Sequence, residues 1–175
     1  MQRAQSAGRR AGFTLIEVLI VVVILGILAA TVLPQFTVSN TEAKESVLRQ
    51  NLQTLRSQFQ LYKFQHNEIL PGAQTGDVIA DQMSKTTDID GTVNATGAYG
   101  PYLVNGIPAN PFMTGANVRT IVKASGTTAF SAPADLATAE AAGGWWFNTT
   151  TGELRANLPS GVGFQNNAGT DYNAF

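Results

Sequence analysis

The segment from Phe13 to Leu33 reads FTLIEVLIVVVILGILAATVL, and it decides how the rest of the chain is interpreted. Its 21 residues carry one charge, at Glu17, and are otherwise almost wholly apolar. A helix of this length, rising about 1.5 Å per residue, covers the ~30 Å hydrocarbon core of a bilayer. The alternative is a buried core strand or helix, but core segments rarely run this long without polar residues. We therefore predict a transmembrane helix.

The charges that flank this segment predict its orientation. Arg3, Arg9 and Arg10 are the only charged residues before Glu17, and basic flanks favour the cytoplasmic side of a membrane. We expect a single-pass chain with a cytoplasmic N-terminus and a body outside the cytoplasm. A secretory signal peptide has the same order of basic and apolar regions but is cut after the apolar run. Ala29-Ala30-Thr31 is a weak site of that kind, and the acid at Glu17 argues against it.

Composition excludes several classes of function. The 175 residues allow one modest soluble domain beside the apolar segment. The absence of cysteine excludes disulfides, thiolate catalysis and cysteine-ligated metals. From Phe13 onward, eight basic residues against twelve acidic ones leave a charge of −4, which argues against nucleic-acid binding. The chain has one histidine, His66, which we predict to be solvated or half-buried, and no nucleophile or phosphate-loop motif, so we predict no enzyme.

Glu17 requires a partner, because a carboxylate at the centre of a membrane costs about 2.5–3.5 kcal/mol on insertion scales. The residues around it, Gly12-Phe13-Thr14-Leu15-Ile16-Glu17, follow Arg9 and Arg10 and open the apolar run. This arrangement closely resembles the class III signal sequence of type IV pilins and of the pseudopilins of type II secretion. The resemblance is specific, and it covers about a seventh of the chain.

The resemblance implies a defined processing event. A prepilin peptidase would cut between Gly12 and Phe13, remove residues 1–12 as a leader, and methylate Phe13 to N-methylphenylalanine. The new amine and Glu17 lie one helical turn apart and can neutralise each other. The resemblance implies that this acid pairs with the amine of a neighbouring subunit during filament assembly, which would offset the cost of burying the charge.

The resemblance also implies partners and a location. The partners are the prepilin peptidase, identical subunits in a helical filament, other pseudopilins and an inner-membrane assembly platform. The chain would lie in the bacterial inner membrane, with its C-terminal domain periplasmic or extracellular, until it is extracted into the filament. An alternative is a type IV pilus subunit for adhesion, motility or DNA uptake, and a further one is an ordinary secreted or membrane-tethered binding domain.

The helix is expected to continue beyond the apolar segment, which we bound at 13–34. Pro34 lacks an amide proton, so it predicts a kink there, or alternatively the end of the helix. Over 35–67 an amphipathic continuation is predicted, ending before Leu70-Pro71-Gly72. Its apolar positions alternate at spacings of four and three: Leu48, Leu52, Leu55, Phe59 and Tyr62.

The remainder, 68–175, predicts a globular domain of short strands and loops. The fold class expected is therefore α+β and pilin-like, with a long N-terminal helix packed on a small antiparallel sheet. Thr150-Thr151-Gly152 predicts a hairpin, and the sequence on both sides of it is similar to that of major pseudopilins. The expected elements are strands at 118–124, 144–149 and 153–158, a short helix or turn at 77–85, and surface connections at 94–112 and 125–143.

Calcium is the one metal that the resemblance suggests, because major pseudopilins often bind it in a loop of the C-terminal domain. Asp88-Ile89-Asp90-Gly91 and Asp171 offer the hard oxygen atoms that this ion prefers. A solvated turn is the more common role of such a segment. The sequence therefore leaves calcium open and assigns no ligand.

Overall fold

The computed structural model describes residues 12–74, 76, 78–161, 163–166 and 168–175, without the side chains of 32–38. Its contacts divide the chain into two compact units, one ending at Thr41 and the other running from Glu42 to Phe175. Apart from Gly12, the predicted leader lies outside the described residues, as do the three arginines expected to orient the chain.

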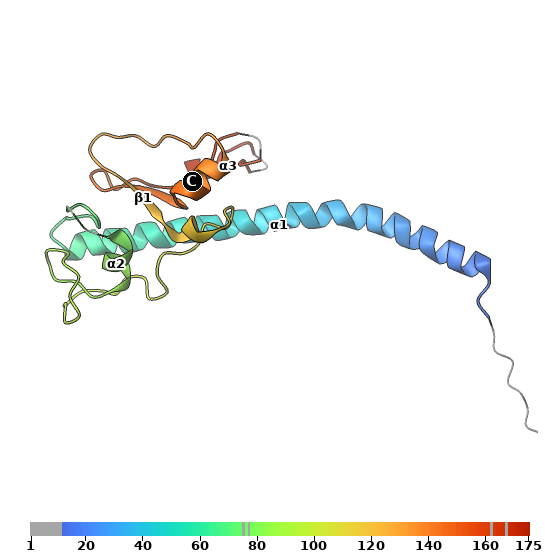
Figure 1. The fold of residues 1–175 in the computed structure, drawn as a ribbon, viewed down its shortest axis with the longest axis horizontal. Helices are drawn as coiled ribbons and strands as arrows, with labels where there is room; N and C mark the ends of the chain where they lie inside the picture. Colours follow the sequence, from blue (N-terminus) through green and yellow to red (C-terminus); the bar gives the residue numbers. More distant parts are fainter. Residues whose placement is uncertain (1–11, 75, 77, 162, 167) are drawn as a thin grey trace, which may run out of the picture. The chain divides into compact units, whose positions relative to one another are not determined.

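The longest element is a single helix, α1 (Leu15–Gln65), of 51 residues. It begins in the first unit, passes through Pro34 without interruption, and ends in the second unit (Figure 1). The predicted long N-terminal helix is therefore confirmed, and the alternative in which it ends at Pro34 is not observed. The kink at Pro34 stays a prediction.

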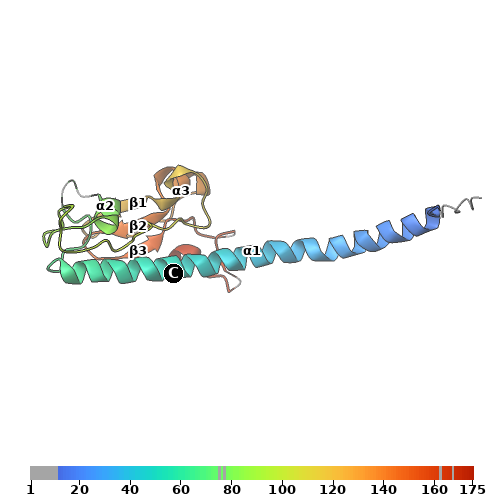
Figure 2. The same ribbon diagram turned by 90° about the horizontal axis from the view of Figure 1, so that it is seen from below.

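The second half of α1 supplies one wall of the core. The five apolar positions predicted from the sequence are all buried, at 2% exposure or less, and they are Leu48, Leu52, Leu55, Phe59 and Tyr62. The Phe59 ring meets Phe147 edge to face, with 4.7 Å between the ring centroids. Figure 2 shows the three strands lying beside this part of the helix. The apolar stripe therefore packs on the sheet, as its spacing predicted.

The sheet is mixed and not purely antiparallel, which corrects the sequence prediction. Its order is β1 (Ile121–Ala124), β2 (Trp145–Asn148) and β3 (Leu154–Ala156). β1 pairs with β2 in parallel, and β2 pairs with β3 antiparallel. A parallel pair needs a crossover of a dozen or more residues, and the segment 125–144 provides one.

That crossover contains a helix, α3 (Leu136–Ala142), in a segment predicted as an irregular connection. Asp135 caps it, because its Oδ1 accepts a hydrogen bond of 2.7 Å from the Thr138 amide. An aspartate directly before an alanine-rich run is a helix-start signal. The prediction missed it because the run is only seven residues long.

The predicted hairpin between β2 and β3 is confirmed. Asn148 organises the turn, because its Oδ1 accepts hydrogen bonds from the amides of Thr150 and Thr151. Gly152 closes the turn at φ +77°, a left-handed conformation that favours glycine, and its amide donates to the Asn148 carbonyl. Both tryptophans that lead into this turn, Trp145 and Trp146, are buried.

Three shorter elements complete the described fold. They are the helix α2 (Ile79–Ser84), within the segment where a short helix or turn was predicted, and the 3₁₀ helices η1 (Ala116–Arg119) and η2 (Tyr172–Ala174). η1 occupies the first residues of the strand predicted at 118–124, so β1 begins at Ile121. The strand pattern was correct only for its second half.

Truncation of a core residue on α1 tests the packing of helix on sheet. Leu55→Ala should lower the free energy of unfolding by about 2–5 kcal/mol, because Leu55 is fully buried and its removal leaves a cavity. Urea unfolding of the detergent-solubilised chain, followed by the fluorescence of the two buried tryptophans, measures this. The matched control, Gln50→Ala on the exposed side of α1, should change the free energy by less than about 0.5 kcal/mol. Equal effects of the two changes would contradict the packing.

Candidate functional site

The bond predicted to be cleaved lies just outside α1. Gly12, Phe13 and Thr14 are not helical and all three are exposed, and the Phe13 side chain is 87% exposed. Within the described residues, no atom beyond the immediate neighbours lies within 4 Å of the position that a Cβ on Gly12 would take. The described part of the chain therefore does not require glycine at this position, so a requirement would have to come from whatever binds the bond.

Thr14 and Glu17 form a capping box at the start of α1. The Glu17 Oε2 accepts hydrogen bonds from the Thr14 amide at 3.0 Å and from the Thr14 hydroxyl at 2.8 Å. In return, the Thr14 Oγ1 accepts a longer one of 3.3 Å from the Glu17 amide. Two helix-end amides are satisfied reciprocally, and a negative charge lies at the positive end of the helix dipole.

This box gives Glu17 an intrachain partner that the sequence reading missed. We predicted a partner for the acid but considered only the amine of Phe13. The signal was present, since threonine followed three residues later by glutamate, just before an apolar run, is a helix-start pattern. Both Thr14 hydrogen bonds go to Oε2, and within the described residues no hydrogen bond to Oε1 is found. One carboxylate oxygen therefore holds the cap, and the other is available to a further donor.

The apolar run that follows is exposed in the single chain. Every Phe, Leu, Ile and Val side chain from Phe13 to Leu28 has an exposed fraction between 51% and 87%. In the part of the chain that the structure describes, no helix is both long enough and apolar enough to cross a membrane.

His66 is fully buried, so our prediction of a solvated or half-buried side chain was wrong. Its ring stacks on Tyr62, with centroids 3.8 Å apart. Nδ1 lies 2.8 Å from the Tyr62 carbonyl, which can only accept, so Nδ1 carries the proton. Nε2 lies 2.9 Å from the Thr87 Oγ1 and accepts from that hydroxyl.

His66 therefore ties the end of α1 to the segment at Thr87. It lies four residues after Tyr62 and so continues the buried stripe, a periodic signal that could have placed it in the core. With both ring nitrogens engaged, it has the geometry of a structural residue.

The aspartates considered for calcium shape turns. The Asp88 Oδ2 accepts a hydrogen bond of 2.8 Å from the Asn94 side chain, and the Asp90 Oδ1 accepts one of 2.9 Å from the Thr92 amide. Hydrogen bonds from the Gly161 amide and the Gln165 side chain lower the pKa of Asp171 below its usual value. Among the described residues, no cluster of three or more histidines and carboxylates could hold a metal ion. The calcium hypothesis gains no ligand set from this part of the chain.

Comparison with known proteins gives the features at the start of α1 a context. Residues 8–33 match the prokaryotic N-terminal methylation motif. This chain is similar to the type II secretion pseudopilins. This chain is 42% identical over 76 residues to the type II secretion system core protein G of Pseudomonas aeruginosa. The match covers 43% of this chain and 50% of that protein.

Two further relatives carry the same name. The core protein G of Pectobacterium carotovorum subsp. carotovorum is 35% identical over 72 residues, 41% of this chain and 46% of the relative. That of Aeromonas hydrophila is 32% identical over 74 residues, 42% of this chain and 52% of the relative. This chain thus spans about half the length of the curated relatives that it matches. No solved structure matches it.

Loss of the threonine hydroxyl tests the capping box. Thr14→Val should speed hydrogen exchange of the first amides of α1 by about twofold to thirtyfold, equivalent to the ~0.5–2 kcal/mol that a helix N-cap contributes. Exchange of the micelle-bound chain, resolved by residue, measures this. Thr31→Val is the matched control, because the Thr31 hydroxyl donates within the helix to the Leu28 carbonyl and caps nothing. Unchanged exchange in the Thr14 variant would exclude a stabilising cap.

Proposed function

We propose that this chain is a structural subunit of a type IV pilin-like filament, and specifically a pseudopilin that assembles into the periplasmic pseudopilus of type II secretion. The observation that carries the proposal is the combination of Gly12-Phe13, the acid Glu17 and the apolar helix in one methylation motif. The name shared by the curated relatives supports secretion over the alternative of a type IV pilus for adhesion, motility or DNA uptake. The role is one of assembly, and we assign no catalytic residue.

Processing is the first step of the proposed function. A prepilin peptidase would hydrolyse the peptide bond between Gly12 and Phe13 and release residues 1–12, after which the amine of Phe13 would be methylated. The exposed, non-helical conformation of residues 12–14 supports this step, because a helix that contained the bond would first have to unwind before cleavage. The capping box leaves the bond outside α1.

Anchoring is the second step. We propose that residues 13–34 lie in the bacterial inner membrane, with the N-terminus cytoplasmic and the domain from residue 68 outside the cytoplasm. The length and apolar character of Phe13–Leu33 and the preceding arginines support this. The exposed side chains between Phe13 and Leu28 need an apolar cover. Lipid would supply it before assembly, and neighbouring subunits afterwards.

Assembly is the third step, and Glu17 is the residue we assign to it. Cleavage creates a positive amine on Phe13, and Oε1 of Glu17 is the carboxylate oxygen left over by the capping box. Pairing of this oxygen with the amine of a neighbouring subunit would neutralise both charges and fix the register between subunits. We also propose a kink in α1 at Pro34. The proposed partners in assembly are an inner-membrane assembly platform and other pseudopilins.

Blocking the cleavage site tests the processing step. Gly12→Leu should leave the chain at full length, because the peptidase subsite is proposed to admit only a very small side chain. Intact mass and N-terminal sequencing of the membrane-extracted chain, from cells with and without the peptidase, measure this. Gly26→Ala is the matched control, since a Cβ at this helical glycine meets nothing within 4 Å, and it should be cut normally. For the unmodified chain, a terminus after Ala30, or a full-length chain both with and without the peptidase, would contradict the proposal.

Neutralising the acid tests the assembly step. Glu17→Gln retains a side-chain oxygen that can serve in a capping box but removes the charge that would pair with the amine. The variant should be cut normally and should reduce filament yield by about tenfold or more, the factor equivalent to ~1.4 kcal/mol per added subunit. Immunoblotting of sheared filaments measures the yield. Glu42→Gln, a neutralisation outside the motif, is the control, and normal filaments from the Glu17 variant would exclude the assembly role.

A further inference from the structure

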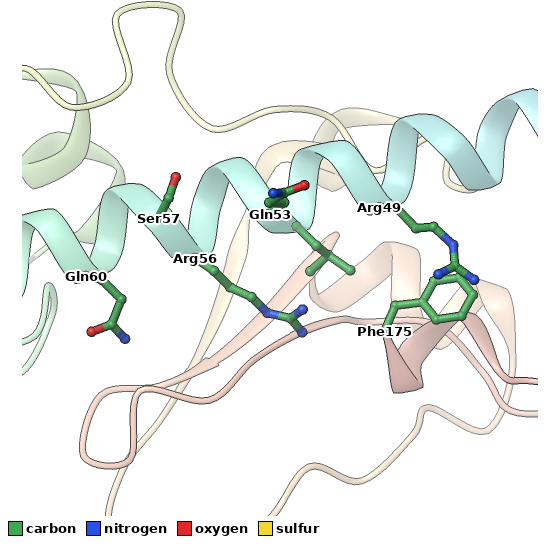
Figure 3. A pocket seen from close by; sticks show the side chains of 7 residues that line it. Arg49, Gln53, Arg56, Ser57, Gln60 and Phe175 are labelled. Atoms are coloured by element: carbon green, nitrogen blue, oxygen red, sulfur yellow. The ribbon is translucent and has the colours of Figure 1, made fainter.

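An open groove runs along one side of α1 in the second unit. Its volume is about 650 Å³, and Phe175 is the one lining residue that does not belong to α1. Figure 3 shows Arg49 and Arg56 leaving α1 on the side where Phe175 lies. The other residues that line it are polar apart from Leu52, and they are Gln53, Ser57 and Gln60.

The groove carries two guanidinium groups, and one of them forms no salt bridge within the described residues. Arg49 pairs with Glu45 at 2.9 Å, and its guanidinium lies 3.7 Å from the centre of the Phe175 ring. Arg56 donates to the Leu154 carbonyl at 2.8 Å, and no salt bridge of Arg56 is found in the described part of the chain. Burial and the neighbouring Arg155 lower the pKa of Arg56, and Glu153 partly opposes this shift.

A turn of opposite character lies elsewhere in the same unit. Asp88 and Asp90 flank Ile89, whose side chain is 48% exposed, and Gly91 closes the turn at φ +87°. The Gly91 amide donates to the Asp88 carbonyl and fixes the turn. Within the described residues, neither aspartate forms a salt bridge. The turn thus presents an apolar side chain between two carboxylates, and the groove presents two guanidinium groups with an aromatic ring against one of them.

The turn and the groove are kept apart within one chain. The hydrogen bond between His66 and Thr87 holds the base of the turn at the end of α1. Arg56 lies ten residues earlier, which corresponds to about 15 Å along the helix. Contact between the two surfaces therefore requires a second copy, displaced along the helix by roughly this distance.

We propose that the Asp88–Gly91 turn of one copy docks into the Arg49–Arg56 groove of another, with Asp90 paired to Arg56 and Ile89 against the Phe175 ring. The inference rests on the proposed function, and it names one of the contacts between identical subunits. The two surfaces differ, so the contact is head-to-tail. Repetition of such a contact gives an open helical filament when the rotation does not close.

Engineered cysteines test the contact, because the chain has none of its own. Two full-length versions, one with Ser57→Cys in the groove and one with Ile89→Cys in the turn, would be produced together in cells that form filaments. A bismaleimide should link them into a dimer that neither version gives alone. Thr54→Cys is the control on α1: it is exposed and outside the groove lining, lies about 60° around the helix from Ser57, and should link to Ile89→Cys at least fivefold less.

Exchange of the two charges is a second test of the same contact. Arg56→Glu should reduce the linked dimer by about fivefold or more, the factor equivalent to one ion pair of ~1 kcal/mol, and Asp90→Arg in the partner version should restore it. Gln50→Glu, which adds an acid elsewhere on exposed α1, should have no such effect. Higher salt should weaken the wild-type contact, since exposed pairs are screened.

The outcomes distinguish the contact from the function beneath it. If filaments form normally, three results would overturn the contact and leave the pseudopilin proposal standing. They are a dimer yield no higher than that of the Thr54 control, no rescue by the exchanged charges, and a link from Ile89→Cys to a different protein. A chain that is never cut and forms no filaments would overturn both. A dimer that depends on Arg56 and is restored by Asp90→Arg would establish the contact.

Discussion

The apolar side of α1 must be shielded from water, and in the domain from residue 42 onward the sheet packs against it. Its three strands have only three or four residues each, and so small a sheet is not stable without packing against another element. The helix provides that element, as the contact between Phe59 and Phe147 illustrates. Sheet and helix therefore depend on each other, and the loops only have to close around them.

One helix serves two kinds of surroundings. In its second half, one side is buried in the domain and the other carries arginines, glutamines and serine. In its first half, the side chains between Phe13 and Leu28 are apolar apart from Thr14 and Glu17, and the Phe, Leu, Ile and Val among them are exposed to solvent in the described part of the chain. A helix that is apolar on nearly all sides is typical of a membrane or of a packed assembly, and the proposed function would place it first in one and then in the other.

The sequence predicted the parts of the fold that follow from periodicity. The stripe from Leu48 to Tyr62 and the hairpin closed by Gly152 were both correct, because each is a local pattern. The parallel pairing of β1 with β2 was missed, since pairing depends on the path of the chain between them and not on either strand.

At the candidate site, local signals were again the readable ones. Gly12, Phe13 and Glu17 stood out through a short motif, and the Thr14 cap was readable but overlooked. The burial of His66 was also readable, from its spacing after Tyr62. The meeting of Arg49, Arg56 and Phe175 arises from tertiary packing, which brings together residues more than a hundred positions apart. No spacing along the chain encodes such a meeting.

The capping box bears on what the proposed cleavage would change at the start of α1. Both of its residues lie on the C-terminal side of the bond between Gly12 and Phe13, and the structure shows the box formed while that bond is intact. The proposed cleavage would leave the same amides and carboxylate on the product. Removal of twelve residues would therefore change the terminal charge and keep the hydrogen-bonding groups of the box in place.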